Sequence, residues 1–301
     1  MTEELQEDLR LRPASDFTEG VTRKFHPKPE DITGTKFRIS KLPFMWIPGE
    51  TSLWTGYNGH GKSILLNQFI LDQAVCGVKS AIASFEMPAI KNLYRMVRQA
   101  LGTDNPTVDE IEKCMEWLGK RVFIYDKTGI GSLPVLKRTF NRARAVHKVT
   151  FFVIDSLMKC GIDPKDYAAQ KNFMDEWQDF AQTYGVNVNI VAHARKGEDE
   201  ETKPGKMDVA GAAELTNLPD NVYSIWRNKR KESLYREYLE TQIVRGMSFE
   251  KLLSLYDCTI DCSKNRELGG DGEGMYGLYF HKPSMQFTAK CGEQPYVYYE
   301  G

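Results

Sequence analysis

Long apolar runs are absent from this sequence of 301 residues. No segment approaches the roughly 20 consecutive apolar residues of a membrane-spanning helix. The first twenty residues carry too many charges for a secretory signal peptide, and no mitochondrial or nuclear targeting segment is evident. We therefore expect a cytoplasmic protein with no membrane partner.

Cysteines are few and are not arranged as metal ligands. The six form no CxxC pair and have no histidines at zinc-site spacing. Cys258 and Cys262 lie four apart in an apolar stretch, which indicates core residues of a strand. Reduced thiols fit a cytosolic compartment.

Net charge is almost absent as well. The 40 Lys and Arg residues nearly balance 41 Asp and Glu residues, which leaves a charge of −1. This excludes a uniformly basic nucleic-acid coat but permits a local basic stripe. A hydrophobic fraction of 41% indicates a globular chain rather than a disordered one.

From about residue 50, short apolar strands alternate with helical segments. Near-continuous apolar strands are typical of parallel sheets that are covered on both faces. The order therefore predicts an α/β fold, a mostly parallel twisted sheet with helices on both faces. The expected strands are 52–56, 80–86, 121–127, 150–156 and 188–194, and the expected helices are 62–76, 89–101, 108–119, 133–148 and 168–184.

The pattern changes towards the two ends of the chain. Residues 1–35 are acidic and weakly apolar, with one possible short helix in EELQEDLRLR and a linker-like HPKPEDITG. They form either a frayed terminus or a linker that docks on a neighbouring subunit, ahead of a main domain over 36–301. Beyond residue 220 we expect a charged helical insertion at 229–252 and strands at 221–228, 254–265, 275–281 and 285–289, the last three forming an antiparallel C-terminal edge.

The stretch TGYNGHGKS contains the phosphate-loop pattern GxxxxGK[ST], after a predicted strand and at the start of a predicted helix. Its glycines let backbone N–H groups turn towards phosphate oxygens, and the helix dipole adds positive potential. Lys62 would hold the β- and γ-phosphates, and Ser63 would ligate Mg²⁺. We predict that ATP, or another NTP or dNTP, binds with Mg²⁺ to Gly56, Asn58, Gly59, His60, Gly61, Lys62, Ser63 and Ile64.

Three polar side chains end predicted strands, where open α/β sheets bind ligands. Asp155 ends FFVID and is suited to hold the water shell of Mg²⁺. Glu86 ends ASFE and is suited to orient or deprotonate a water beside the γ-phosphate. His193 ends VNIVAHA, where it is either a γ-phosphate sensor or an ordinary strand-end residue. Together with the phosphate loop, the two carboxylates indicate a catalytic centre.

Taken in order, GYNGHGKS, SFE, FFVIDS, IVAHARK, DVAGAAELTNLPDNVYSIWRN and CSKNR resemble the ring helicases of the DnaB family, superfamily 4. The likeness covers about residues 40–290 and is greatest to mitochondrial Twinkle and the helicase half of bacteriophage primase–helicases. It implies a RecA-like P-loop ATPase core and a replicative DNA helicase. It also implies a homohexameric or heptameric ring around single-stranded DNA, with a primase and a replicative polymerase as further candidate partners. For a bacteriophage chain the compartment would be the host cytoplasm.

The resemblance assigns further roles. Lys62, Ser63 and Asp155 match the nucleotide and magnesium residues, Glu86 the catalytic base and His193 the sensor. Arg266 resembles the arginine finger that reaches the neighbouring subunit's ATP, with Lys264 on the same face of an alternating strand. Arg227 resembles the arginine that stacks on adenine, and Phe280 the aromatic on its other side, although a strand phenylalanine is usually a core residue.

A ring needs positive charge only along its central hole, so a balanced chain is compatible with DNA binding. Residues 194–211 occupy the family's pore-loop position, although four acids at 198–201 also suit a solvated turn. Ala210 and Ala213 stand where the family often has an arginine and a glycine. The DNA-binding candidates are Arg195, Lys196, Lys203, Lys206 and Gly211, with Lys159 and Lys165 as a weaker second set.

Two other functions fit the same core. A RecA-class recombinase ATPase would form filaments, and a DNA-binding ATPase switch would act without unwinding. The SKNR segment and His193 favour the helicase over the recombinase.

Overall fold

The computed structural model describes residues 11–26, 34–163, 165–194, 202–205, 208–209, 214–244 and 246–299. The contacts divide the chain into two units, Met1–Gly34 and Thr35–Gly301. In the first unit, η1 (Ala14–Phe17) leads into α2 (Thr18–Phe25). This helix follows the segment in which a short helix was expected, and residues 1–10 and 27–33 lie outside the described part.

Helix α2 carries an uncovered apolar stripe. Phe17, Val21 and Phe25 recur at four-residue spacing and are 49%, 52% and 78% exposed. None of the residues of α2 is buried. Its stability therefore does not come from packing within the described part of its own unit.

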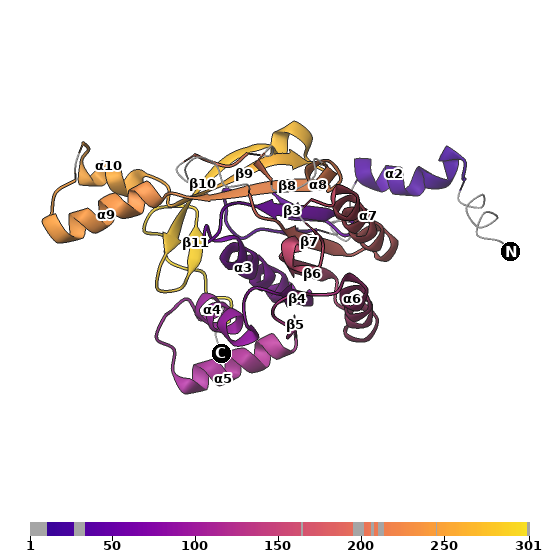
Figure 1. The fold of residues 1–301 in the computed structure, drawn as a ribbon, viewed down its shortest axis with the longest axis horizontal. Helices are drawn as coiled ribbons and strands as arrows, with labels where there is room; N and C mark the ends of the chain where they lie inside the picture. Colours follow the sequence, from indigo (N-terminus) through magenta and orange to yellow (C-terminus); the bar gives the residue numbers. More distant parts are fainter. Residues whose placement is uncertain are drawn as a thin grey trace. The chain divides into compact units, whose positions relative to one another are not determined.

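The second unit is built on a nine-stranded sheet of order β11-β10-β9-β8-β3-β7-β6-β4-β5 (Figure 1). From β8 to β5 the neighbouring strands are parallel, and β9, β10 and β11 are antiparallel. The mostly parallel sheet with an antiparallel edge is thus confirmed, and the antiparallel part begins at the pairing of β8 with β9. The strands are β3 (Thr51–Thr55), β4 (Ser80–Ser84), β5 (Val122–Tyr125), β6 (Phe151–Asp155), β7 (Asn187–Val191), β8 (Asn221–Arg227), β9 (Cys258–Asn265), β10 (Gly274–His281) and β11 (Gln286–Thr288).

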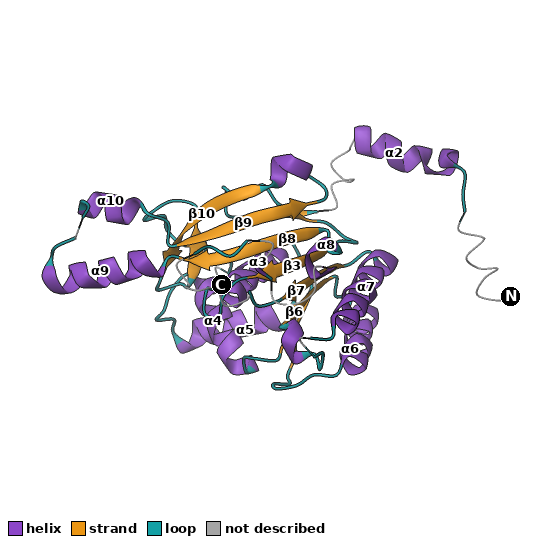
Figure 2. Cartoon of the chain, turned by 45° about the horizontal axis from the view of Figure 1, so that its top comes forward, coloured by secondary structure: helices purple, strands orange, loops and turns teal. Residues whose placement is uncertain are grey.

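Helices cover both faces of this sheet (Figures 1 and 2). Alternate strand residues enter two separate cores: Trp54 faces α3 (Lys62–Val75), α4 (Ala89–Leu101) and α5 (Val108–Gly119). Its neighbour Leu53 faces α6 (Leu133–His147) and α7 (Tyr167–Tyr184). Burial on both faces explains why these strands have almost no polar residues.

Several short elements were not predicted. A two-stranded sheet joins β1 (Thr35–Lys36) and β2 (Met45–Trp46), and α8 (Glu214–Asn217) precedes β8. The remaining short elements are η3 (Leu157–Lys159) and η5 (Gly269–Gly272). In the described part of the chain, none of the helices has both the length and the apolar content to cross a bilayer.

The 229–252 insertion is helical, as expected, and forms α9 (Lys229–Thr241) and α10 (Phe249–Ser254). Because α10 continues to Ser254, the strand expected from residue 254 begins only at Cys258. Cys258 and Cys262 are buried in β9, as predicted.

Glutamine side chains attach the edge strand β11 to the helices of the parallel half. Gln68 of α3 both donates to the Phe287 carbonyl at 2.9 Å and accepts from the Phe287 N–H at 2.8 Å. Gln99 of α4 donates to the Met285 carbonyl at 2.9 Å. These bonds satisfy edge groups that would otherwise lack partners, and they fix β11 beside the helix that begins at the phosphate loop.

Asp72 of α3 is a buried acid next to Arg38. Its Oδ2 accepts from the Arg38 N–H at 3.2 Å, while the guanidinium Nε lies 3.9 Å from Oδ1. The guanidinium also stacks 4.3 Å from the centre of the Tyr296 ring. Burial raises the pKa of Asp72 to about 7, against a weaker opposing effect of Arg38.

We predict that Asp72→Asn becomes more stable relative to the original chain as pH rises. The native state keeps the Asp72 proton up to about pH 7, whereas the unfolded chain loses it near its ordinary pKa of 3.8. The native carboxyl therefore stabilises the fold at low pH and loses that contribution as pH rises through 7. Urea unfolding should show the variant's advantage growing by about 1–3 kcal/mol between pH 5 and 8. Asp109→Asn on exposed α5 is the control and should show no such trend, and a pH-independent difference for Asp72→Asn would contradict the assignment.

Candidate nucleotide-binding and catalytic site

The phosphate loop connects β3 to α3 and passes very close to β8. At Gly56 (φ 143°) a Cβ atom would lie 2.3 Å from the Ile225 carbonyl oxygen, so only glycine fits. Gly61 (φ 96°) occupies the turn into α3, where a Cβ would meet the Phe287 ring at 3.1 Å. Two of the pattern's glycines are therefore required by close approach as well as by backbone angle.

Lys62 is buried at the start of α3 and folds back onto the loop. Its Nζ donates to the carbonyls of Gly56 at 2.8 Å and Tyr57 at 2.9 Å. Burial lowers the pKa of this ammonium to about 8, although Asp155 and Glu86 oppose the shift. The group is thus held at the loop by bonds that incoming phosphate oxygens can replace.

Ser63 and Asp155 meet as the sequence predicts. The Ser63 hydroxyl donates to Asp155 Oδ2 at 2.5 Å, and burial raises the pKa of Asp155. A hydroxyl and a carboxylate oxygen are the hard ligands that Mg²⁺ prefers beside a phosphate chain. Among the described residues no three His, Cys, Asp or Glu side chains form a metal site by themselves. This set therefore fits a magnesium ion shared with a nucleotide.

Glu86 and His193 form one hydrogen-bonded cluster with Ser156. His193 Nε2 lies 2.9 Å from Glu86 Oε1, and the Ser156 hydroxyl donates to the same oxygen at 2.8 Å. The bond from His193 and the bond from Ser156 lower the pKa of Glu86 to about 2, so its carboxylate stays ionised. Sequence reasoning missed Ser156, although it directly follows Asp155.

A cavity of about 530 Å³ opens at this cluster. Glu86 and His193 line it together with Asn58 of the phosphate loop. Lys159, a weaker DNA-binding candidate, also lines it, so this residue lies at the catalytic edge rather than apart from it. The cavity is large enough for a water molecule beside the end of a phosphate chain.

A second cavity, of about 240 Å³, lies on the other side of the phosphate loop. It brings together Arg227 and Phe280, the two residues that the resemblance places on either side of the base. Phe287 of β11 and Glu232 of α9 also line it and were missed by sequence reasoning. Nothing in the spacing of the sequence indicates that either residue reaches this place. The remaining predicted members are Gly59, His60, Gly61 and Ile64.

His60 has a structural role within the loop. Its side chain is 1% exposed, and its Nδ1 accepts from the Arg227 backbone N–H at 3.1 Å. An accepting Nδ1 requires the neutral ring with its proton on Nε2. The His60 side chain therefore holds the phosphate loop against the end of β8.

Lys264 and Arg266 lie at the opposite edge of the sheet. Asn265 pairs with Asn221 at the start of β8, whereas the phosphate loop contacts Arg227 at its end. A strand of this length separates the two edges by about 20 Å. Arg266 pairs with buried Asp220 at 2.7 Å, and Lys264 donates to the Pro219 carbonyl at 2.5 Å. Arg266 thus cannot reach the phosphate loop of its own chain.

The described part of the chain includes Lys203 among the five main DNA-binding candidates. Its Nζ lies 5.3 Å from the centre of the Trp226 ring and 3.0 Å from Met275 Sδ. Ala194 and Val209 form an antiparallel bridge, so the ends of the expected pore loop meet. Arg195, Lys196, Lys206 and Gly211, together with Ala210 and Ala213, lie outside the described residues.

Comparisons with known proteins agree with this geometry. Residues 30–199, more than half of the chain, match the protein family described as AAA domain. A solved structure, the ATPase domain of the DnaB-like helicase of phage SPP1, matches with a TM-score of 0.69 at 14% identity, over 92% of this chain and 98% of that one. An identity this low carries the fold alone, and it confirms the RecA-like α/β architecture.

We predict that nucleotide affinity falls as pH rises through 8. The Lys62 ammonium, with its pKa near 8 in the free protein, loses the charge that phosphate binding needs above that pH. Titration with fluorescent ATP between pH 7 and 9.5 should show about a tenfold loss of affinity. Lys62→Arg, whose guanidinium stays charged, should remove most of this dependence. An equal pH dependence in both proteins would show that another group titrates.

Proposed function

The chain belongs to the AAA domain family and is an ATP hydrolase, and from this premise we propose that it is a replicative DNA helicase. In this proposal it assembles into a homohexameric or heptameric ring, translocates on single-stranded DNA and unwinds duplex DNA. Family membership and the fold support the resemblance to DnaB-type ring helicases. A primase and a replicative polymerase are the proposed further partners.

The observation that carries the proposal is a division of the site between the two edges of the sheet. Lys62, Glu86 and His193 lie at the carboxyl edge, while Arg266 lies at the other edge beside Asp220. A copy that presents its Arg266 edge to the phosphate loop of the next copy would complete one site. Repetition of this head-to-tail contact closes a ring if the rotation between copies permits it.

Within each site, the residues of this chain have separate tasks. Lys62 would exchange its two loop carbonyls for the β- and γ-phosphates, and Ser63 and Asp155 would hold Mg²⁺, which neutralises phosphate charge when bound. Glu86, kept ionised by its hydrogen bonds, would orient the attacking water and accept its proton. Arg266 of the adjacent copy would stabilise charge on the γ-phosphate.

His193 connects this chemistry to DNA in the proposal. Its ring reaches Glu86, and the next residue, Ala194, donates its N–H to the Gly56 carbonyl at 3.1 Å. Ala194 also begins the segment that closes at Val209. Loss of the γ-phosphate would change the bonds of His193 and so move this segment, which would carry the DNA backbone with it.

The apolar stripe of α2 suits a role in assembly. Phe17, Val21 and Phe25 are too exposed for a stable isolated helix and would be covered by a neighbouring copy. This gives the 1–35 linker its proposed docking function.

A combined assay tests the proposal. ATP hydrolysis stimulated by single-stranded DNA, displacement of a strand from forked DNA, and closed rings in electron micrographs with an ATP analogue are the expected results. Helical filaments would favour the recombinase, and DNA-dependent hydrolysis without strand displacement would favour the switch.

We predict that Arg266→Ala leaves nucleotide binding nearly unchanged but lowers hydrolysis by about 10²–10³-fold, because the finger stabilises only the transition state. Lys62→Ala should abolish hydrolysis by losing the phosphate contact. Mixing the two inactive variants should restore part of the turnover, since an intact phosphate loop can then meet an intact Arg266. Mixed rings that stay inactive at every ratio would show that Arg266 does not act on an adjacent copy.

A further inference from the structure

The charged insertion has a structural feature that the proposed function leaves unused. Helices α9 and α10 form a small hairpin, which we call the α9–α10 hairpin (residues 229–254). In both views it extends beyond the end of the sheet (Figures 1 and 2). Its own contacts are aromatic, with the Tyr238 and Phe249 rings stacked at 4.0 Å. Its root, however, lies against the cavity that contains Arg227 and Phe280.

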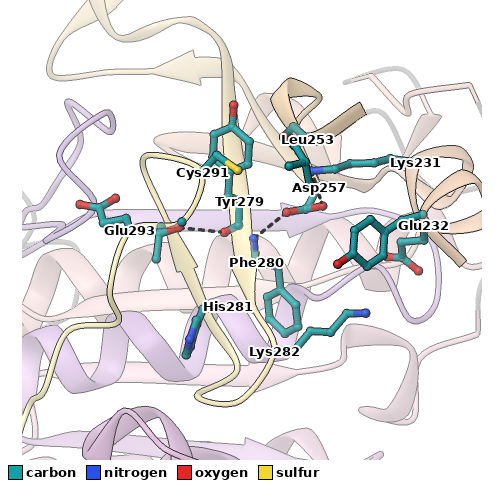
Figure 3. A pocket seen from close by; sticks show the side chains of 13 residues that line it. Lys231, Glu232, Leu253, Asp257, Tyr279, Phe280, His281, Lys282, Cys291 and Glu293 are labelled. Carbon is teal, nitrogen blue, oxygen red and sulfur yellow. Dashed lines mark hydrogen bonds and ion pairs between the residues drawn. The ribbon is translucent and has the colours of Figure 1, made fainter. Parts of the chain in front are cut away.

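The root of the hairpin is fixed by a buried cation. Lys231 is 6% exposed, and its Nζ pairs with Asp257 Oδ1 at 2.8 Å and donates to the Leu255 carbonyl at 2.6 Å. Figure 3 shows this ion pair beside Phe280. The Asn228 side chain caps the same helix by accepting from the Lys231 N–H at 3.0 Å. The first turn of α9 is therefore rigidly attached to the end of β8 and the start of β9.

Asp257 extends this attachment to one wall of the base cavity. Its second oxygen, Oδ2, accepts from the Phe280 backbone N–H at 2.9 Å (Figure 3). Lys231 thus positions the backbone that carries the Phe280 ring through a single shared carboxylate. The aromatic wall cannot shift far without breaking a buried ion pair.

The next residue, Glu232, attaches the opposite wall. Its two oxygens accept from Nε and Nη2 of Arg227, the latter at 2.7 Å. A bidentate pair of this kind fixes the plane of the guanidinium as well as its position. Glu232 is less exposed than Arg227, 29% against 45%, so the carboxylate is the more constrained partner.

Glu232 also stands at the junction of three cavities. It lines the base cavity, the cavity of about 350 Å³ drawn in Figure 3, and a third of about 330 Å³ that contains Lys229 and Arg236. A change at Glu232 would therefore be felt at the base without any change at the phosphate loop.

Resting on the nucleotide site of the proposed function, we infer that Glu232 is a positioning residue for the nucleobase. It holds the Arg227 guanidinium in the plane that stacks on the base, opposite Phe280. The first turn of α9 thereby sets both walls of the base cavity, Arg227 through Glu232 and Phe280 through Lys231 and Asp257. The inserted hairpin acts on the base and not on phosphate chemistry.

The test compares ATP with inorganic tripolyphosphate, which has the phosphates but no base. For Glu232→Gln, the KM for ATP should rise about five- to tenfold with kcat within about twofold, because uniform binding is lost. Inhibition by tripolyphosphate should be unchanged. The double variant Arg227→Gln/Glu232→Gln should have the KM of Arg227→Gln alone, since Glu232 acts through Arg227. Glu240→Gln, an exposed residue on the same helix, is the matched control and should behave as the original chain.

The other outcomes overturn the inference. An unchanged or lowered KM would mean that Glu232 does not present Arg227 to the base, and equal weakening of ATP and tripolyphosphate would indicate a general disturbance of the site. If Glu232→Gln does not fold, Glu232→Asp keeps the charge, shortens the side chain and permits the same comparison. If the original chain neither hydrolyses ATP nor binds tripolyphosphate, the proposed function itself fails, and this inference fails with it.

Discussion

The close approach of the phosphate loop to strand β8 is the constraint on which the rest of the site depends. Gly56 lies so near the Ile225 carbonyl that no side chain can stand between them, and His60 bonds to the Arg227 backbone. This contact joins the parallel half of the sheet, which carries the phosphate-binding and catalytic groups, to the antiparallel half, which carries the base cavity. A nucleotide spanning both halves would therefore meet one rigid surface.

The carboxyl-edge residues were predictable because each is fixed by local pattern. A glycine-rich turn between a strand and a helix, and acids at strand ends, converge wherever parallel strands lie side by side. Ser63 and Asp155 are 92 positions apart, yet strand order alone brings them together. The sheet itself was predictable for the same reason, since apolar strands and amphipathic helices alternate with a regular period.

The base cavity shows where such reasoning stops. Phe287 and Glu232 reach it only because β11 folds back onto α3 and because the inserted hairpin begins beside β8. Neither placement leaves a local signal, because a three-residue strand and a charged helix occur in many settings. The pairing of Arg266 with Asp220 is equally silent, since it depends on the antiparallel register of β8 and β9.

That pairing has a consequence for a protomer that has not yet found a neighbour. Its Arg266 is neutralised by an acid that is almost wholly buried, and its own triphosphate pocket lacks the cation. Under the proposed function, an isolated copy would therefore be idle even when saturated with ATP. Turnover would increase more steeply than protein concentration at high dilution, so that fuel is consumed only where copies have gathered, as on a strand that they encircle together.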